Sequence, residues 1–189
     1  MNRKILALAP LLIFIFLCVF LYQGLFANPR EIQTGRLGQT MPAFNLPDLM
    51  QDDKRWTDES LKGEVYLLNV WGTWCPTCLV ELGYLTKLRE QGVKIIGLYY
   101  VQGYDADFDG PFDMQALRTD VSDMLSRAGD PYQFNILDLH RTLSLDLGVS
   151  GAPETFLVDK TGKILLHHTG DLNLRVWRAK FAPVMQELN

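Results

Sequence analysis

The 189-residue sequence predicts an α/β domain preceded by an apolar N-terminal segment. Two nearly continuous apolar runs, VYLLNVW at 65–71 and VKIIGLYYV at 93–101, are typical of strands that are buried on both faces of a sheet. Between them, Pro76 suits the first turn of a helix and Gly92 suits the end of one. A strand, a helix and a second strand in this order predict a right-handed parallel crossover.

Shorter patterns predict the elements around this unit. The helix after Pro76 is expected to pack through one stripe, formed by Leu79, Leu82, Leu85 and Leu88. The prolines of MPAFNLP, residues 41–47, restrict that segment to a short edge strand. Further along, the sequence predicts helices at about 112–127, 140–147 and 174–188, a strand at 134–137, and a hairpin of 155–159 with 163–168.

The N-terminal segment contains an uncharged, almost wholly apolar run of 18 residues, 5–22, preceded by Arg3 and Lys4. As a helix this run would be about 27 Å long, close to the roughly 30 Å of a bilayer's hydrocarbon core. The positive-inside rule would keep Arg3 and Lys4 in the cytosol and export the rest of the chain. The sequence therefore predicts a single-pass inner-membrane protein whose domain is exported across the membrane.

A cleaved signal peptide is the alternative for this segment. Signal peptides usually have an apolar core of about 7–15 residues and small residues before the cut. Here the run is longer, and a cut after Ala27 would put Leu25 where a small residue is usual. We therefore expect a retained signal anchor at 1–27 with a transmembrane helix over about 5–26, a polar tether at 28–40, and the exported domain at 41–189.

The exported part is acidic. Without Arg3 and Lys4, the chain has 16 of its 18 basic residues and all 22 acidic residues, which gives this part a net charge of −6. Because no cluster of basic residues suggests a nucleic-acid-binding face, we expect no nucleic acid partner.

Two of the three cysteines, Cys75 and Cys78, form a Cys-x-x-Cys pair directly after the first predicted strand. Such a pair can be half of a zinc site, a structural disulfide or a redox couple. A zinc site needs two more ligands at suitable spacing, but the chain has no second cysteine pair, and its histidines are His140, His167 and His168. His167 and His168 alternate along a predicted strand, so they cannot both face one site, and we expect them at the surface. A structural disulfide that closes so short a loop would stabilise the chain weakly.

The position of the pair favours redox chemistry. Cys75 lies at the expected start of a helix, where unpaired N–H groups and the helix dipole stabilise a thiolate. A lowered pKa would make Cys75 the attacking nucleophile. Cys78 lies one turn further along, is expected to be better buried, and would resolve the mixed disulfide. Cys18, in the apolar run, is expected to act as a small hydrophobic residue.

Two stretches of the sequence resemble a known family. NVWGTWCPTC at 69–78 is similar to the active site of thioredoxin-fold proteins, and GVSGAPETFLVD at 148–159 is similar to their second signature. With the later HTGDLN, they resemble the DsbE (CcmG) family of membrane-anchored thiol:disulfide interchange proteins of cytochrome c maturation, in the TlpA/ResA group. The resemblance implies a thioredoxin-like α/β fold, with a central mixed sheet flanked by helices.

The resemblance also implies which residues surround the cysteine pair. A cis proline at Pro153 would face the cysteines and leave the backbone of Ala152 free to pair with an extended partner, whereas an ordinary loop proline is the alternative. Pro76 and Thr77, between the cysteines, would belong to the same partner-binding surface. Trp74 is expected to be exposed beside the pair and to contact a partner, or else to cover the site as a hydrophobic lid.

Acidic residues near the pair are expected to tune the thiols. Many thioredoxins carry a buried aspartate six residues before the first cysteine, but Asn69 stands there and cannot accept a proton. Glu81 is similar to an acidic residue of the CcmG group and is our candidate for modulating Cys78; a solvated helix charge is the alternative. Glu154 matches the GAPE motif of the family. A carboxylate near the site would raise the thiol pKa values and oppose the helix dipole.

The resemblance implies a protein-disulfide reductase that keeps the haem-binding cysteines of apocytochrome c, or of a cytochrome c maturation thiol protein, reduced. No cofactor is expected beyond the redox-active disulfide of Cys75 and Cys78. Electrons would come from a membrane thiol reductase of the DsbD/CcdA type. The alternatives are a periplasmic oxidant, a reductant for another client such as nitrite reductase assembly, and a non-catalytic escort for apocytochrome or haem.

The loop at 102–113 raises one further possibility. Asp105, Asp107 and Asp109 resemble the opening of a calcium loop, but Ala116 stands where a bidentate glutamate is needed. A solvated acidic insert is therefore the preferred interpretation.

Overall fold

The computed structural model describes residues 3–26, 36–104 and 108–188, and the chain divides into two compact units, residues 1–32 and 33–189. The first unit contains helix α1 (Arg3–Phe26), whose side chains are described between residues 10 and 22. Over the described residues, no helix combines the length and the apolar character that a membrane crossing requires. Most of the predicted tether, residues 28–35, lies outside the described part of the chain.

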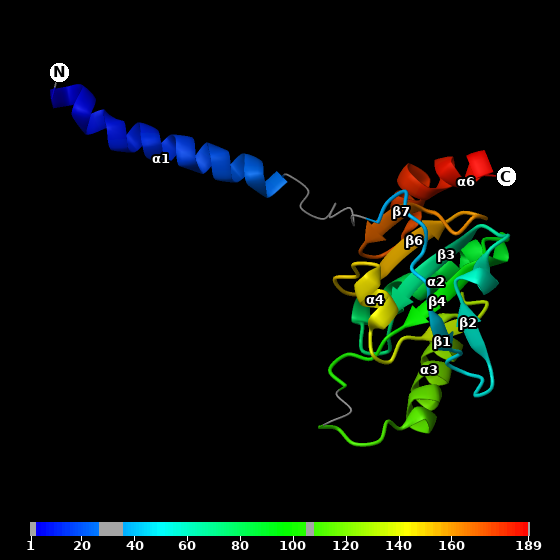
Figure 1. Ribbon diagram of the computed structural model, residues 1–189. Helices are drawn as coiled ribbons and strands as arrows, with labels where there is room; N and C mark the ends of the chain where they lie inside the picture. Colours follow the sequence, from blue (N-terminus) through cyan, green and yellow to red (C-terminus); the bar gives the residue numbers. More distant parts are fainter. Residues whose placement is uncertain (1–2, 27–35, 105–107, 189) are drawn as a thin grey trace. The chain divides into compact units, whose positions relative to one another are not determined.

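A five-stranded sheet forms the centre of the second unit (Figure 1). In spatial order its strands are β5 (Asn135–Leu137), β4 (Ile95–Tyr99), β3 (Tyr66–Trp71), β6 (Glu154–Val158) and β7 (Ile164–Thr169). Strands β3, β4 and β5 are parallel, whereas β6 pairs antiparallel with both β3 and β7. The sheet is therefore mixed, as the resemblance implied, and the predicted hairpin is confirmed as β6 and β7.

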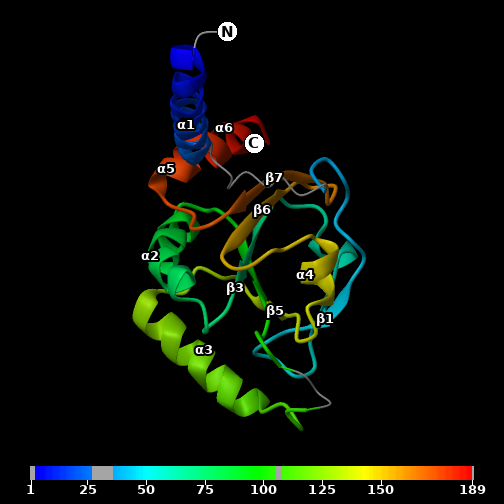
Figure 2. The ribbon, with the colours of Figure 1, turned by 90° about the vertical axis from the view of Figure 1, so that its left-hand side faces the viewer.

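Helices cover both faces of this sheet (Figure 2). Helices α2 (Pro76–Glu90) and α3 (Met114–Ala128) lie on one face, and α4 (Thr142–Asp146) lies on the other. The β3–α2–β4 unit confirms the predicted parallel crossover. Pro76 starts α2, and Gly92 follows its end with a φ of 90°, a conformation that glycine adopts without steric cost.

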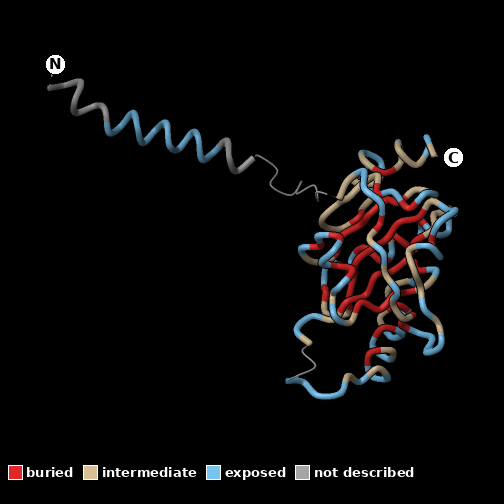
Figure 3. Tube along the Cα trace, in the orientation of Figure 1, coloured by how far each residue is buried: buried red, intermediate tan, exposed pale blue. Residues whose placement is uncertain are grey.

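Strand β3 contributes to both core layers. Leu67 and Trp71 belong to the apolar cluster beneath α2 and α3, whereas Leu68 and Val70 belong to the cluster on the α4 side. All residues of β3 are buried, and the buried trace runs through the middle of the domain (Figure 3). Because each buried large apolar side chain contributes about 1.5–3 kcal/mol, β3 is a rigid base for the cysteine segment that follows it.

The predicted leucine stripe of α2 is wrong at its first member. Leu79 is 44% exposed, whereas Leu82, Leu85 and Leu88 are buried. Each step of three residues turns about 300° around a helix, so leucines at every third position drift by about 60° per step. Leu79, at the start of the stripe, therefore lies off the buried face. Cys78 and Glu81 occupy that face in the first turns of the helix.

The segment before β3 forms a small second sheet that the sequence predicted only in part. The expected edge strand at 41–47 is confirmed as β1 (Asn45–Pro47), but it pairs with an unpredicted strand, β2 (Arg55–Thr57), and not with the central sheet. Asp48 holds the turn between them, since its carboxylate accepts hydrogen bonds from Met50 N and Trp56 Nε1. A short helical turn, η1 (Glu59–Leu61), then leads to β3.

The predicted C-terminal helix at 174–188 is confirmed as one uninterrupted helical stretch with a π-helical turn inside it. α5 (Leu174–Val176) is followed by the π-helical turn, η2 (Trp177–Phe181), and by α6 (Ala182–Leu188). Pro183 explains the wider turn, because proline has no N–H to donate and its ring clashes with the carbonyl four residues earlier.

Candidate active site

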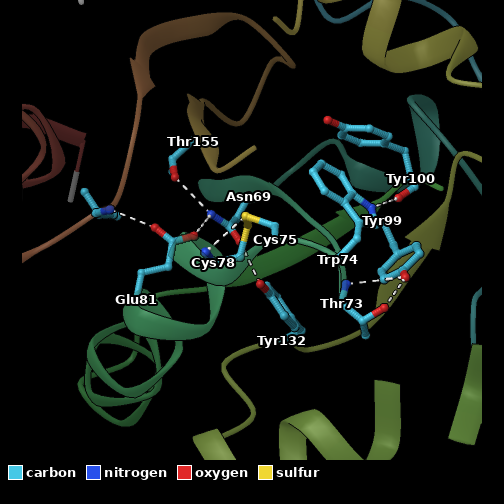
Figure 4. Close-up of a disulfide and its surroundings, with 11 residues drawn as sticks. Asn69, Thr73, Trp74, Cys75, Cys78, Glu81, Tyr99, Tyr100, Tyr132 and Thr155 are labelled. Atoms are coloured by element: carbon cyan, nitrogen blue, oxygen red, sulfur yellow. Dashed lines mark hydrogen bonds between the residues drawn. A yellow bond between two sulfur atoms is a disulfide. The ribbon is translucent and has the colours of Figure 1, made fainter. Parts of the chain in front are cut away.

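The structure joins Cys75 and Cys78 in a disulfide where β3 gives way to α2 (Figure 4). Cys75 is the N-cap residue of α2, and its Sγ accepts a hydrogen bond from Cys78 N at 3.1 Å. The N–H of Cys78, in the first turn of α2, thus points at the sulfur that would carry a thiolate after reduction. Cys75 is 3% exposed and Cys78 is fully buried, so the expected order of burial is confirmed with only a small difference between the two.

A closed hydrogen-bond network lies behind the disulfide and centres on Asn69 and Glu81. Asn69 Nδ2 donates to Glu81 Oε1 at 2.9 Å and to Thr155 Oγ1 at 3.1 Å, while Tyr132 Oη donates to Asn69 Oδ1 at 2.7 Å. The other Glu81 oxygen accepts from Leu172 N at 2.8 Å. Glu81 is 2% exposed, so its interpretation as a solvated helix charge is wrong.

Burial raises the pKa of Glu81 into the neutral range. Desolvation raises the pKa of its carboxyl to about 7, although hydrogen bonds from Leu172 N and Asn69 act in the opposite direction. Cys78 and Glu81 are three residues apart on α2, so both lie on the same buried helix face. The site therefore holds, close to the resolving cysteine, a carboxyl group that can gain or lose a proton near neutral pH.

Glu154 holds the loop before Pro153 and is not directed at the cysteines. Its Oε1 accepts hydrogen bonds from Ser150 N, Ser150 Oγ and Gly151 N at 2.9, 2.7 and 3.0 Å, and its Oε2 lies 2.7 Å from His167 Nε2. Burial would raise the pKa of Glu154, but the hydrogen bonds from His167 and Ser150 outweigh it and lower the pKa. Glu154 thus fixes the loop, whose Ala152–Pro153 peptide bond is cis as the resemblance implied.

The prediction that both tandem histidines lie at the surface is wrong. The side chain of His167 is 2% exposed, and its ring stacks on Phe156 with a centroid distance of 4.3 Å. His168 points to the opposite face of β7, where it is partly buried near Phe181. Strand alternation was predicted correctly, but His168 lies near Phe181 of the C-terminal segment, and His167 packs on Phe156 and contacts Glu154.

Trp74 is a partly buried lid rather than a fully exposed contact residue. Its Nε1 donates to the carbonyl of Tyr100 at 2.9 Å, and the two rings pack with a centroid distance of 4.8 Å. Ala152, also partly buried, packs against the same two apolar clusters as Trp74. Pro76 and Thr77 are exposed in the first turn of α2.

We predict that Gly72→Ala displaces this lid. A Cβ atom at residue 72 would lie 2.2 Å from Nε1 of Trp74, so the indole must move and lose its hydrogen bond to Tyr100. Urea unfolding should show a loss of about 1–3 kcal/mol, with a changed near-UV circular dichroism spectrum. Gly83→Ala is the matched control, because its Cβ would meet only Ala128 O at 3.8 Å, and helix propensity favours alanine there by about 1 kcal/mol. Equal stability and spectra for Gly72→Ala and the wild type would contradict this packing.

Most of the network behind the disulfide was not predicted from the sequence. Asn69 was expected only to be unable to accept a proton, whereas its amide connects β3, α2 and β6. Tyr132 and Thr155 were not singled out, and the contact from Leu172 is a backbone N–H that carries no sequence signal.

Two aspartates of the possible calcium loop, Asp105 and Asp107, lie outside the described residues. Within the described part of the chain, no group of three or more His, Cys, Asp or Glu side chains is placed to hold a metal ion.

The chain is similar in sequence to a known protein family and to named thiol:disulfide interchange proteins. The profile of the Redoxin family matches residues 36–180. The chain is 43% identical over 188 residues to the thiol:disulfide interchange protein DsbE of Pseudomonas aeruginosa, which covers 100% of this chain and 96% of that protein. Identity to the DsbE of Vibrio cholerae is 40% over 193 residues, covering 100% and 97%.

Among solved structures, the thioredoxin domain of a thiol-disulfide oxidoreductase from Bacteroides vulgatus matches with a TM-score of 0.57 at 20% identity. The match covers 82% of this chain and 100% of that one. At this low identity, the structural match shows only that the fold is thioredoxin-like.

Proposed function

This chain belongs to the Redoxin family and, within it, to the DsbE thiol:disulfide interchange proteins, and we propose that it reduces protein disulfides in the periplasm during cytochrome c maturation. It is a thiol:disulfide oxidoreductase. The observation that supports the proposed direction is the carboxyl of Glu81, which is buried on the same helix face as Cys78. A carboxylate there disfavours the thiolate and so makes the reduced pair a better electron donor, whereas the helix start at Cys75 acts in the opposite sense. The proposed client is the pair of haem-binding cysteines of an apocytochrome c, or a thiol protein that serves it.

The two cysteines act in sequence. In the reduced protein, Cys75 Sγ is the nucleophile, because the N–H of Cys78 and the start of α2 stabilise its thiolate. It attacks one sulfur of the client disulfide, the other client sulfur leaves as a thiolate, and a mixed disulfide forms. Cys78 then attacks Cys75 Sγ, the client's second sulfur leaves, and the Cys75–Cys78 disulfide forms. Two electrons thereby pass to the client.

Glu81 supports the second step. Cys78 must lose its proton before it can attack, and it is fully buried. A carboxyl whose pKa is about 7 can take up a proton at neutral pH, and Asn69 and Leu172 N hold it in one orientation. We infer that Glu81 modulates Cys78, and that Glu154 acts indirectly by positioning the loop of Pro153.

The proposed client-binding surface surrounds the disulfide. Pro76 and Thr77 are exposed, and Ala152 is partly exposed in the loop before the cis proline. An extended client segment could pair with the backbone of Ala152 while Trp74 covers one side of it. No cofactor is proposed beyond the disulfide, so a membrane thiol reductase of the DsbD/CcdA type would return the two electrons.

The sequence supports an anchored location for this chemistry. The apolar run at 5–22, with Arg3 and Lys4 before it, is proposed to be a retained signal anchor in the inner membrane of a bacterium. Residues 28–40 would then tether the domain at 41–189 in the periplasm.

The reduction potential of the Cys75–Cys78 couple tests the direction of electron flow. We expect a value at or below about −200 mV for the full-length chain in detergent, equilibrated against glutathione and read by thiol alkylation and mass spectrometry. A value near −120 mV, roughly that of a strong oxidant, would instead make this protein a donor of disulfides.

A further inference from the structure

A groove with an apolar part and an acidic part lies beside the disulfide, between the start of α2 and one face of α3. It has a volume of about 650 Å³. Its lining residues come from the segment before Cys75, from α2 and from α3: Thr73, Trp74, Leu79, Asp120, Asp123, Met124, Arg127 and Ala128. Because Trp74 lines the groove and directly precedes Cys75, the groove adjoins the residue that would bond to a client cysteine.

One part of the lining is apolar: Trp74 and Met124 pack against the core, whereas Leu79 points away from it. Leu79 is 44% exposed on a helix whose other leucines are buried, and Val80 beside it is 76% exposed. Met124 and Trp74 continue the apolar lining across the groove. Exposed apolar side chains gathered at a hollow are typical of a surface that meets another chain.

The other part of the lining is acidic. Asp123 pairs with Arg127 on the same helix at 3.3 Å, and both side chains are more than half exposed. Asp120 is exposed, and within the described residues it has no hydrogen bond or ion pair. Asp120 lines the groove together with Thr73, two residues before Cys75, whose Oγ1 lies 2.8 Å from the hydroxyl of Tyr99.

We propose that this groove selects clients that carry a basic residue and an apolar residue beside the reactive cysteine, with Asp120 receiving the basic side chain and Leu79 the apolar one. The proposal rests on the proposed reductase function and specifies the chemistry of its client. The pairing of Asp123 with Arg127 leaves Asp120 as the uncompensated charge of the groove. The net charge of −6 on residues 28–189 would add long-range attraction for basic clients.

Two disulfide-bridged peptides test this selection. They are identical Cys-x-x-Cys peptides, except that Lys or Glu stands two residues before the first cysteine. The pre-reduced full-length protein should reduce the Lys peptide about 5-fold faster than the Glu peptide at low ionic strength, as a second-order rate constant followed by stopped-flow fluorescence. In about 0.5 M salt this preference should largely disappear.

Variants separate the charge from the apolar contact. Asp120→Asn should reduce the preference to about 2-fold, and Asp120→Lys should reverse it. Asp146→Asn, which removes an exposed acid from α4 on the other side of the sheet, should keep the wild-type ratio. Leu79→Gln should slow both peptides about equally, by roughly 3-fold, and leave the ratio unchanged.

The outcomes distinguish this proposal from the function on which it rests. If the wild type reduces both peptides at equal rates and Asp120→Lys changes neither rate, the groove does not select basic clients, although the reductase function stands. If the reduced wild type reduces neither peptide, both the reductase function and the selection are overturned.

Discussion

Replacing Cys75 with serine is expected to abolish disulfide reduction, with a loss of at least about 10³-fold in rate. The attacking species is a thiolate, and a serine hydroxyl remains protonated at neutral pH even when the N–H of Cys78 points at it. The measurement is reduction of a disulfide-bridged peptide by the pre-reduced full-length protein. Cys18→Ser is the matched control, since this third cysteine lies on α1 and should leave the rate unchanged.

Cys78→Ser should fail at the second step and not the first. Cys75 can still attack, but no thiol remains to break the mixed disulfide, so a covalent adduct of protein and peptide should accumulate. Mass spectrometry would detect the adduct, and dithiothreitol would release it. An adduct on Cys75→Ser in place of Cys78→Ser would assign the two cysteines the opposite roles.

The elements that position these cysteines could be predicted because their signals are local. The apolar run of β3, Pro76 at the start of α2 and Gly92 after its end all lie within a short stretch of chain. Burial at both faces of the sheet and the first turn of the helix follow directly from such patterns. The same locality explains why the position of Cys75 at the N-cap could be expected.

The environment of Glu81 could not be predicted in the same way. Its network partners are brought together from β6, from the segment before β5 and from the segment after β7, and the link from Asn69 to Thr155 spans 86 residues. One local signal was present, because Glu81 lies three residues after Cys78 and directly before Leu82, at positions that share one helix face. That face indicated burial, but not the hydrogen bonds that make burial of a carboxyl possible.

On β7 and α2, local patterns in the sequence were present but predicted the exposure of some residues wrongly. A stripe of leucines at every third residue and two adjacent histidines both suggested simple assignments. Leu79 faces a groove because the stripe drifts around the helix, and His167 is buried because Glu154 from the neighbouring strand supplies its partner. In both cases the decision depends on what packs against the element, which the sequence of the element does not contain.

Glu81→Gln is expected to remove a large pH dependence of stability from the oxidised protein. In the native state the pKa of Glu81 is about 7, above its ordinary value of 4.5, so between these values the native state binds more protons than the unfolded state. The contribution of Glu81 is therefore fully present below about pH 4.5 and is lost as the pH rises through 7. The shift corresponds to about 3 kcal/mol across this window.

The difference between wild type and Glu81→Gln isolates this contribution, because every other titrating group is common to both proteins. Urea unfolding of the full-length chain at pH 4.5 and pH 8 should show the difference changing by about 3 kcal/mol, with Glu81→Gln relatively more stable at the higher pH. A glutamine amide can still accept from Leu172 N or Asn69 Nδ2, so the network need not collapse. Glu90→Gln, at the exposed end of the same helix, is the matched control and should shift stability by no comparable amount. Parallel stability curves for wild type and Glu81→Gln would mean that Glu81 is already ionised in the native state, and it could then not take the proton of Cys78.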